Sequence, residues 1–167
     1  MTPEDILKHE PIVLTPEQRQ SFFEDGFLAV EDLVSDEWLE CLRQRSDEMI
    51  DRSRQYTDSN KEYDLSPDHT PDQPYVRRLR APVDRHPDFW KFAHNSIFTD
   101  VAADLVGPDV KFHSCKLNYK HPGGGEVVKW HQDIPAWPHT NFSPVTLGVY
   151  FHDVGEAEGP LACIPGS

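Results

Sequence analysis

The sequence is poor in basic residues and contains no long apolar run. Only 16 Lys and Arg stand against 29 Asp and Glu, which gives a formal net charge of −13. Binding to nucleic acid or to anionic lipid needs clustered basic side chains, so we expect neither nucleic acid nor a membrane as partner. No stretch approaches the roughly 20 apolar residues of a membrane-spanning helix, and the N-terminus lacks the pattern of a secretory signal. We therefore expect a cytoplasmic protein.

Cysteine is also scarce. Cys41, Cys115 and Cys163 lie far apart and form no CxxC pair, and any single bridge would leave one thiol over. A disulfide framework is therefore not expected, and a reducing compartment fits better. A hydrophobic content of 37% over 167 residues is enough for one domain with a core and too high for a wholly disordered chain.

The first half of the chain carries helix signals. Residues 15–26 open with Thr-Pro-Glu-Gln, which combines an N-cap, a proline at the first helical position and a capping glutamine, and they end in glycine. Ser35 predicts the cap of a longer helix, and residues 96–106 carry the apolar side of another. Residues 27–30 predict a short strand, and residues 51–74 predict a surface loop.

The segment Arg-Arg-Leu-Arg at 77–80 is unusual in a chain this acidic. Two interpretations stay open for it: a solvated edge of the protein, or a local binding site for an anion.

From residue 109 the pattern changes to short runs of β-forming residues between Pro and Gly turns, which predicts a barrel or sandwich. We expect helices over 1–108 and a β core over 109–167. A core of about four strands would leave edges unpaired, so we expect it to continue beyond residue 167. The predicted strands cover residues 110–119, 127–133, 145–153 and 161–164.

The best candidate for chemistry is Trp-His-Gln-Asp at 130–133. In a strand, residues two apart point to the same side, so His131 and Asp133 would present an imidazole nitrogen and a carboxylate oxygen to one point. These are two of the three ligands of the facial triad that holds non-haem Fe(II). Alone, the His-x-Asp pattern is common by chance, and a surface pair is the ordinary interpretation.

Longer stretches around this motif resemble one family. The chain reads KLNYKHPGGGEVVKWHQD up to Asp133, ends in GPLACIPGS and carries FFEDGFLAV over residues 22–30. In these motifs it resembles the phytanoyl-CoA dioxygenase family of Fe(II)- and 2-oxoglutarate-dependent oxygenases. The resemblance implies an α+β fold with a helical N-terminal layer packed on a double-stranded β-helix, a cupin-like jelly roll that carries iron at one mouth. It also implies Fe(II), 2-oxoglutarate and O₂.

By this resemblance, His131 and Asp133 are the first two iron ligands. The family's third ligand and the arginine that pairs with 2-oxoglutarate follow the Ile-Pro-Gly-Ser turn, so we expect both beyond Ser167 and regard residues 1–167 as the N-terminal part of a single domain. Each further matched side chain also fits an ordinary packing or surface role. The positions matched to the co-substrate are Lys116, Asn118, Thr146 and Arg77, and those matched to the substrate are Gln132 and Trp137.

The expected function is a dioxygenase that hydroxylates a C–H bond of a small organic molecule while 2-oxoglutarate is decarboxylated to succinate. Halogenating oxygenases replace the metal carboxylate by a small residue, so the presence of Asp133 favours hydroxylation. Three alternatives stay open: a non-catalytic metal-binding or regulatory jelly-roll module, a cupin-like enzyme using zinc or manganese, and an interaction module that docks through residues 51–74. Whether the 167 residues are active by themselves is also open.

Overall fold

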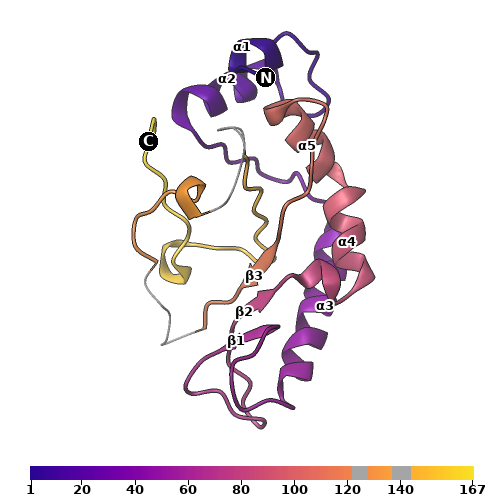
Figure 1. The fold of residues 1–167 in the computed structure, drawn as a ribbon, viewed down its shortest axis with the longest axis vertical. Coiled ribbons are helices and arrows are strands. Elements are labelled where there is room, and N and C mark those ends of the chain that lie inside the picture. The colour runs from indigo at the N-terminus through magenta and orange to yellow at the C-terminus, as the bar shows by residue number, and fades with distance from the viewer. Residues whose placement is uncertain (122–127, 137–143) are drawn as a thin grey trace. The chain divides into compact units, whose positions relative to one another are not determined.

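The computed structural model describes residues 1–121, 128–136 and 144–167, in which helices and one small sheet form two compact units (Figure 1). Unit 1 comprises Met1–Val34, Asn95–Lys111 and Val128–Ser167, and unit 2 comprises Ser35–His94 and Phe112–Val127. The helices are α1 (Pro3–Ile6), α2 (Pro16–Asp25), α3 (Asp36–Ser53), α4 (Pro87–His94) and α5 (Ile97–Val106). The strands are β1 (Tyr63–Leu65), β2 (Val76–Arg80) and β3 (Lys116–Asn118), and short 3-10 helices are η1 (Pro82–Asp84), η2 (Ile134–Ala136) and η3 (Glu156–Glu158).

The core of unit 2 lies between the long helix α3 and the sheet. Helix α3 begins at Asp36 because the Ser35 side chain accepts the Trp38 amide, and it contacts both β2 and α4. Its buried positions repeat every three or four residues, which places them on one face. They are Leu42, Ser46, Met49 and Ser53.

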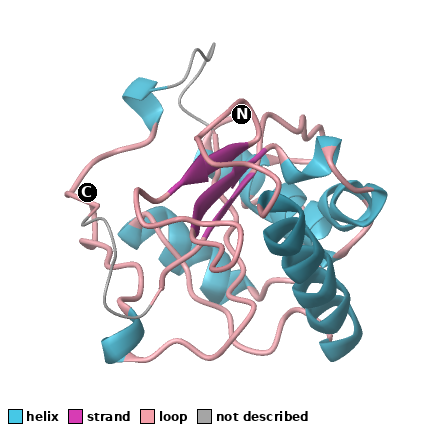
Figure 2. Cartoon of the chain, turned by 90° about the horizontal axis from the view of Figure 1, so that it is seen from below, coloured by secondary structure: helices cyan, strands magenta, loops and turns pink. Residues whose placement is uncertain are grey.

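The sheet of unit 2 has the order β1–β2–β3 with antiparallel neighbours throughout, shown as magenta arrows in Figure 2. The side chains of Tyr63 on β1 and of Val76 and Leu79 on β2 are completely buried. The Tyr63 hydroxyl donates to the Met49 carbonyl of α3 at 2.9 Å. The pairing of β1 with β2 shifts register between Asp64 and Leu65. Val76 and Leu79 are both buried although they are three residues apart, which departs from the strict alternation of a regular strand.

Unit 1 is held together by one buried arginine and one buried aspartate. Arg19 of α2 donates to the carbonyls of Asp104, His9 and Ile6. The Asp104 carboxylate on α5 accepts the backbone N–H groups of three consecutive residues, Ile12, Val13 and Leu14, at 2.7–2.8 Å. These bonds tie the N-terminal segment to both helices, because each buried polar group finds its partner in the backbone. Leu14, Val101 and Leu105 form the apolar centre of the unit.

The predicted helix boundaries are confirmed. Thr15 and Gln18 form a reciprocal capping box at the start of α2, and Gly26 ends the helix at φ +83° in the left-handed region. Ser96 caps α5, which ends at Gly107. Helix α4 was not predicted. The loop predicted over residues 51–74 is wrong in part, because α3 extends to Ser53 and β1 lies inside it.

The predicted strands of the second half are largely wrong for the residues that the structure describes. Only Lys116–Asn118 of the 110–119 run is a strand, and the described residues of 127–133, 145–153 and 161–164 form none, nor do residues 27–30. The described part of the chain is thus a mixture of helices with a small antiparallel sheet. A strand needs a neighbour to accept its backbone hydrogen bonds, and no described segment pairs with these runs.

Candidate metal site

His131 and Asp133 lie in unit 1, in irregular chain that leads into η2. The strand expected there is not formed, yet the two side chains still meet. His131 Nε2 lies 3.3 Å from Asp133 Oδ1, with side chains 54% and 44% exposed. The two side chains therefore point to one place, which is open to solvent.

A backbone hydrogen bond defines the state of the His131 ring. Its Nδ1 lies 2.8 Å from the Lys129 carbonyl oxygen, and a carbonyl can only accept, so Nδ1 carries the proton. In the neutral ring Nε2 then holds a lone pair directed at a carboxylate oxygen. An imidazole nitrogen and a carboxylate oxygen that approach each other to 3.3 Å are both atoms of types that bind metal ions. This donor set fits a metal that takes nitrogen and oxygen ligands.

Thr146 approaches the same carboxylate from a different part of the chain. Its Oγ1 donates to Asp133 Oδ2 at 3.4 Å. The neighbours Val145 and Leu147 pack on the apolar centre of unit 1, and because side chains alternate along extended chain, Thr146 is left facing the other way. A hydrogen bond to the outer oxygen of a ligating carboxylate is the usual means of fixing its orientation.

The remaining candidates separate into two groups. Gln132 lies beside the pair and is exposed, whereas Trp137 lies outside the described residues. The other three lie in unit 2, Arg77 on β2 and both Lys116 and Asn118 on β3. The structure therefore brings Thr146 to the His131–Asp133 pair and gathers the three other co-substrate candidates on the sheet of unit 2.

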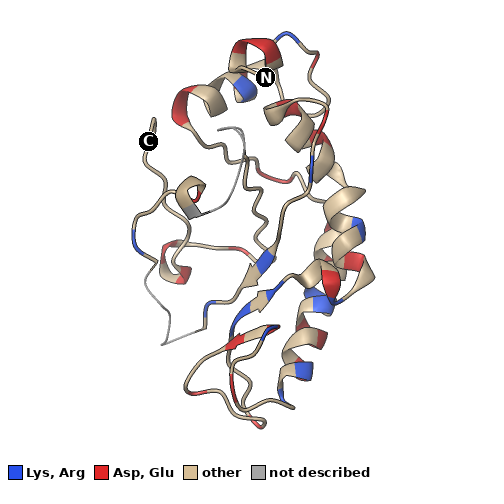
Figure 3. Ribbon diagram, viewed as in Figure 1, with Lys and Arg blue, Asp and Glu red and all other residues tan. Residues whose placement is uncertain are grey.

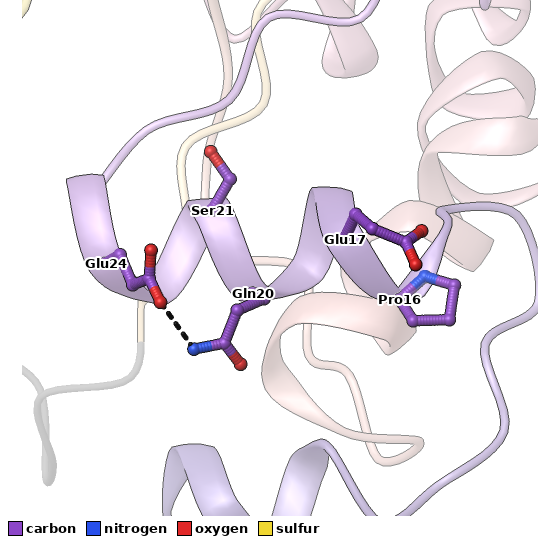
Figure 4. Close-up of a pocket in the computed structure, with 5 residues that line it drawn as sticks. All are labelled: Pro16, Glu17, Gln20, Ser21 and Glu24. Atoms are coloured by element: carbon purple, nitrogen blue, oxygen red, sulfur yellow. Dashed lines mark hydrogen bonds between the residues drawn. The ribbon is translucent and has the colours of Figure 1, made fainter.

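Over residues 1–121, 128–136 and 144–167, no group of three or more His, Cys, Asp or Glu side chains is placed to hold a metal ion. One surface hollow in this part is lined by five residues of α2 and includes neither member of the pair (Figure 4). Two of its five residues are acidic, which disfavours an anionic co-substrate there. The five are Pro16, Glu17, Gln20, Ser21 and Glu24.

A grouping that sequence patterns did not indicate joins Cys41, His86 and Asp88 in unit 2. Cys41 Sγ lies 3.7 Å from Asp88 Oδ2, but His86 Nδ1 already accepts the Asp88 backbone N–H. Burial, followed by the negative charge of Asp88, raises the pKa of the Cys41 thiol. Arg45, which donates to Asp88 at 2.8 Å, lowers the pKa of that carboxyl. The raised pKa keeps the Cys41 thiol protonated. Cys41 is therefore a structural residue and not an activated nucleophile.

Comparison with known proteins identifies one family. The family model described as phytanoyl-CoA dioxygenase (PhyH) matches residues 22–167. A probable alpha-ketoglutarate-dependent hypophosphite dioxygenase from Stutzerimonas stutzeri is 25% identical, with 90% of this chain and 52% of that protein aligned. An ectoine dioxygenase from Bordetella parapertussis is 26% identical, with 97% of this chain and 55% of that protein aligned. An L-proline trans-4-hydroxylase from Streptomyces griseoviridis is 27% identical, with 86% of this chain and 51% of that protein aligned.

The chain spans about half the length of these curated relatives. No solved structure matches it. In the segments that the structure describes, none of the helices combines the length and the apolar character needed to span a membrane.

Proposed function

The chain belongs to the phytanoyl-CoA dioxygenase family, and from this membership we propose that the protein is an Fe(II)- and 2-oxoglutarate-dependent dioxygenase that hydroxylates a small organic molecule. The relatives named above, which act by name on ectoine, proline and hypophosphite, support a small substrate. We further propose the family's double-stranded β-helix, in which residues 1–167 are part of one domain. A cytoplasmic location belongs to the same proposal.

The observation that carries the proposal is the convergence of His131 Nε2 and Asp133 Oδ1 at 3.3 Å. These two atoms would hold the iron. When bound, Fe(II) with 2-oxoglutarate and O₂ supplies the oxidising power that protein side chains lack. The carbonyl of Lys129 keeps the proton on Nδ1, so that Nε2 is available as a ligand, and Thr146 fixes the carboxylate from its other oxygen.

By the family resemblance, Lys116, Asn118 and Arg77 are proposed to contact 2-oxoglutarate. Lys116 and Asn118 are two residues apart on β3 and both are exposed, which places an ammonium and an amide on one face of the strand. Arg77 on β2 carries a further positive charge. Gln132 and Trp137 are proposed to contact the substrate, as the family resemblance implies.

The test uses the full chain, loaded with Fe(II) without oxygen and then supplied with 2-oxoglutarate and O₂. His131→Ala and Asp133→Ala are expected to abolish both stoichiometric iron binding and succinate formation, because each removes one of few ligands. His152→Ala, which removes another exposed histidine of unit 1, is the matched control and is expected to retain both. Stoichiometric iron with normal succinate formation in either ligand variant would refute the assignment. Zinc bound tetrahedrally would favour a cupin-like enzyme of another chemistry.

A smaller change at the same site tests the role of Thr146. Thr146→Val removes the hydroxyl that donates to Asp133 and keeps the branched shape, so the affinity for iron should fall about tenfold. Thr146→Ser keeps the hydroxyl and should bind iron almost as the unmodified protein does. Equal affinities in the two variants, measured by competition with a chelator, would show that the hydrogen bond does not matter for the metal.

A further inference from the structure

The connection between β1 and β2, residues 66–75, is held in place through a buried histidine. His69 is only 7% exposed, and both nitrogens of its ring meet backbone atoms of unit 2. Nδ1 lies 2.8 Å from the backbone nitrogen of Tyr75, and Nε2 lies 3.1 Å from the carbonyl oxygen of Tyr56. The ring therefore joins the end of the connection to the chain that follows α3.

These two hydrogen bonds fit one state of the His69 ring. A backbone N–H can only donate, so Nδ1 must offer a lone pair to Tyr75, and a carbonyl can only accept, so Nε2 must carry the proton. The ring that makes both bonds is therefore neutral. A second proton would bind at Nδ1, where it would face the Tyr75 N–H, donor against donor. Protonation of His69 removes the bond to Tyr75 and leaves a buried donor without its acceptor.

Arg54 holds the same connection from a neighbouring position. Its Nη1 donates to the carbonyls of Pro71 and Asp72 at 2.8 and 2.9 Å. Together with the contact of His69 to Tyr56, this places two attachments of residues 66–75 on residues 54–56, directly after α3. An arginine stays charged throughout the range in which histidine titrates, so of these two attachments the one through His69 depends on pH.

The charged groups near the ring are poorly placed to stabilise an imidazolium. Both ring nitrogens are taken by backbone atoms, which leaves neither for a carboxylate. On the adjoining strand β1, Asp64 lies 3.5 Å from Arg77 and 3.8 Å from Arg80. The charged residues on the segments around Tyr56 and His69 are exposed, so solvent screens them, and such residues are coloured blue and red in Figure 3. They are Arg54, Asp58, Asp68 and Asp72.

A second histidine beside Tyr75 provides an internal comparison. The His121 ring packs on the Tyr75 ring with centroids 4.1 Å apart, and its Nε2 donates to the Val76 carbonyl at 2.9 Å. This bond needs a proton on Nε2, which the charged ring also carries, so a second proton at Nδ1 leaves the bond intact. Protonation therefore spares the hydrogen bond of His121, whereas it breaks one of the two bonds of His69.

We propose that His69 is an acid-sensitive latch, which fastens residues 66–75 to the end of α3 when its ring is neutral and releases them when it is protonated. The latch stabilises the connection at neutral pH, and this stabilisation is lost as the pH falls, because only the neutral ring makes both bonds. Strands β1 and β2 keep their own ladder and their buried side chains, so the release is confined to the connection. The latch goes beyond the proposed iron chemistry and requires no metal.

The first measurement is NMR of the metal-free full chain, which does not depend on the stability of a variant. At about pH 7.5, nitrogen–proton spectra of the side chains should show the His69 ring with its proton on Nε2. The backbone order parameters of residues 66–73 should be about 0.85 at this pH and should fall below about 0.6 at about pH 5.5. Those of α3 should stay near the higher value at both.

Two variants separate the latch from a general loosening in acid. His69→Gln replaces the ring by an amide that does not titrate, so the order of residues 66–73 should no longer depend on pH. His121→Gln is the matched control and should keep the acid-induced loosening. The proposal is overturned if the unmodified chain does not loosen, if His69→Gln loosens as the unmodified chain does, if His121→Gln abolishes the loosening, or if Nδ1 of His69 carries the proton. Because no iron is present, these results are independent of whether the protein turns over 2-oxoglutarate.

Discussion

Strand β2 of unit 2 and the segment 144–150 of unit 1 both contain β-forming residues, yet only β2 is a strand. In β2, Val76 and Leu79 are completely buried, and the strand has hydrogen-bonded neighbours on both sides. In 144–150, side chains alternate between exposed and half-buried, as in a strand, but no ladder forms. The difference shows that alternation sets which side chains share a face, whereas a strand requires a partner.

The contrast extends over the whole of residues 128–167. None of the described residues in this segment whose burial is known is buried, and Val128, Trp130, Tyr150, Leu161 and Ile164 are all exposed apolar side chains. The same types of residue form the cores elsewhere in the chain. Packing, and not composition, therefore separates the two regions, and identical substitutions made in both should have different effects.

The largest expected difference between the two regions is in the free energy of unfolding lost when a leucine is replaced by alanine. Leu79→Ala should lower the free energy of unfolding by about 2–5 kcal/mol, because it leaves a cavity under the sheet. Leu161→Ala, at a side chain that is 76% exposed, should change it by less than about 0.5 kcal/mol. Urea denaturation followed by circular dichroism measures both. Similar losses at the two positions would mean that residues 128–167 are packed more tightly than the structure indicates.

Tyrosine substitutions in the two regions should differ less in their free energy of unfolding, and this difference should depend on pH. Burial raises the pKa of Tyr63 from 10.0 to about 12, so the folded state favours the neutral phenol. The contribution of this group to stability is present below pH 10 and is lost as the pH rises from 10 to 12, with a total on the order of 2 kcal/mol. Tyr63→Phe should flatten this decline and cost about 1 kcal/mol at neutral pH, since it removes the bond to the Met49 carbonyl.

Tyr150→Phe is the matched control in the other region, because that side chain is 56% exposed. Its unfolding free energy should follow the unmodified profile between pH 8 and pH 11 to within about 0.5 kcal/mol. Burial also raises the pKa of Tyr119 to about 12, so Tyr63→Phe should remove only part of the alkaline decline. A decline that is unchanged in Tyr63→Phe would contradict the assignment to this residue.

The smallest effect concerns thiol reactivity and leaves stability unchanged. Cys163 is exposed, whereas Cys41 and Cys115 are half-buried and burial raises the pKa of both thiols. Iodoacetamide should therefore modify Cys163 first, since the thiolate is the reactive form and access is required. Mass spectrometry of a short labelling time course identifies the order. Earlier labelling of Cys115 would show that unit 2 opens more readily than its packing implies.

The helices were predictable because their signals are local. Thr15, Pro16 and Gln18 act within a single turn of α2, and Ser96 and Gly107 bound α5 in the same way. The His131–Asp133 pair was predictable for a related reason, because two residues so near in sequence share a direction in extended chain. The strand assumed around the pair was wrong, and the pair did not need it.

Contacts between distant segments were not predictable in this way. Nothing in the local pattern indicates that Thr146 donates to Asp133, that Arg78 donates to Asn118, or where the pairing of β1 with β2 shifts register. Each depends on which backbone becomes a neighbour.

The amino-acid sequence alone determined the helix boundaries, the two candidate metal ligands and, by its motifs, the family. Tertiary structure alone decided which β-forming residues became strands, which hydroxyl supports the carboxylate of Asp133, and that the basic residues of β2 and β3 lie in one small sheet. The physical reason is range: caps and two-residue spacings act through bonded neighbours, whereas a ladder, a core and a charge cluster exist only when segments tens of residues apart come together.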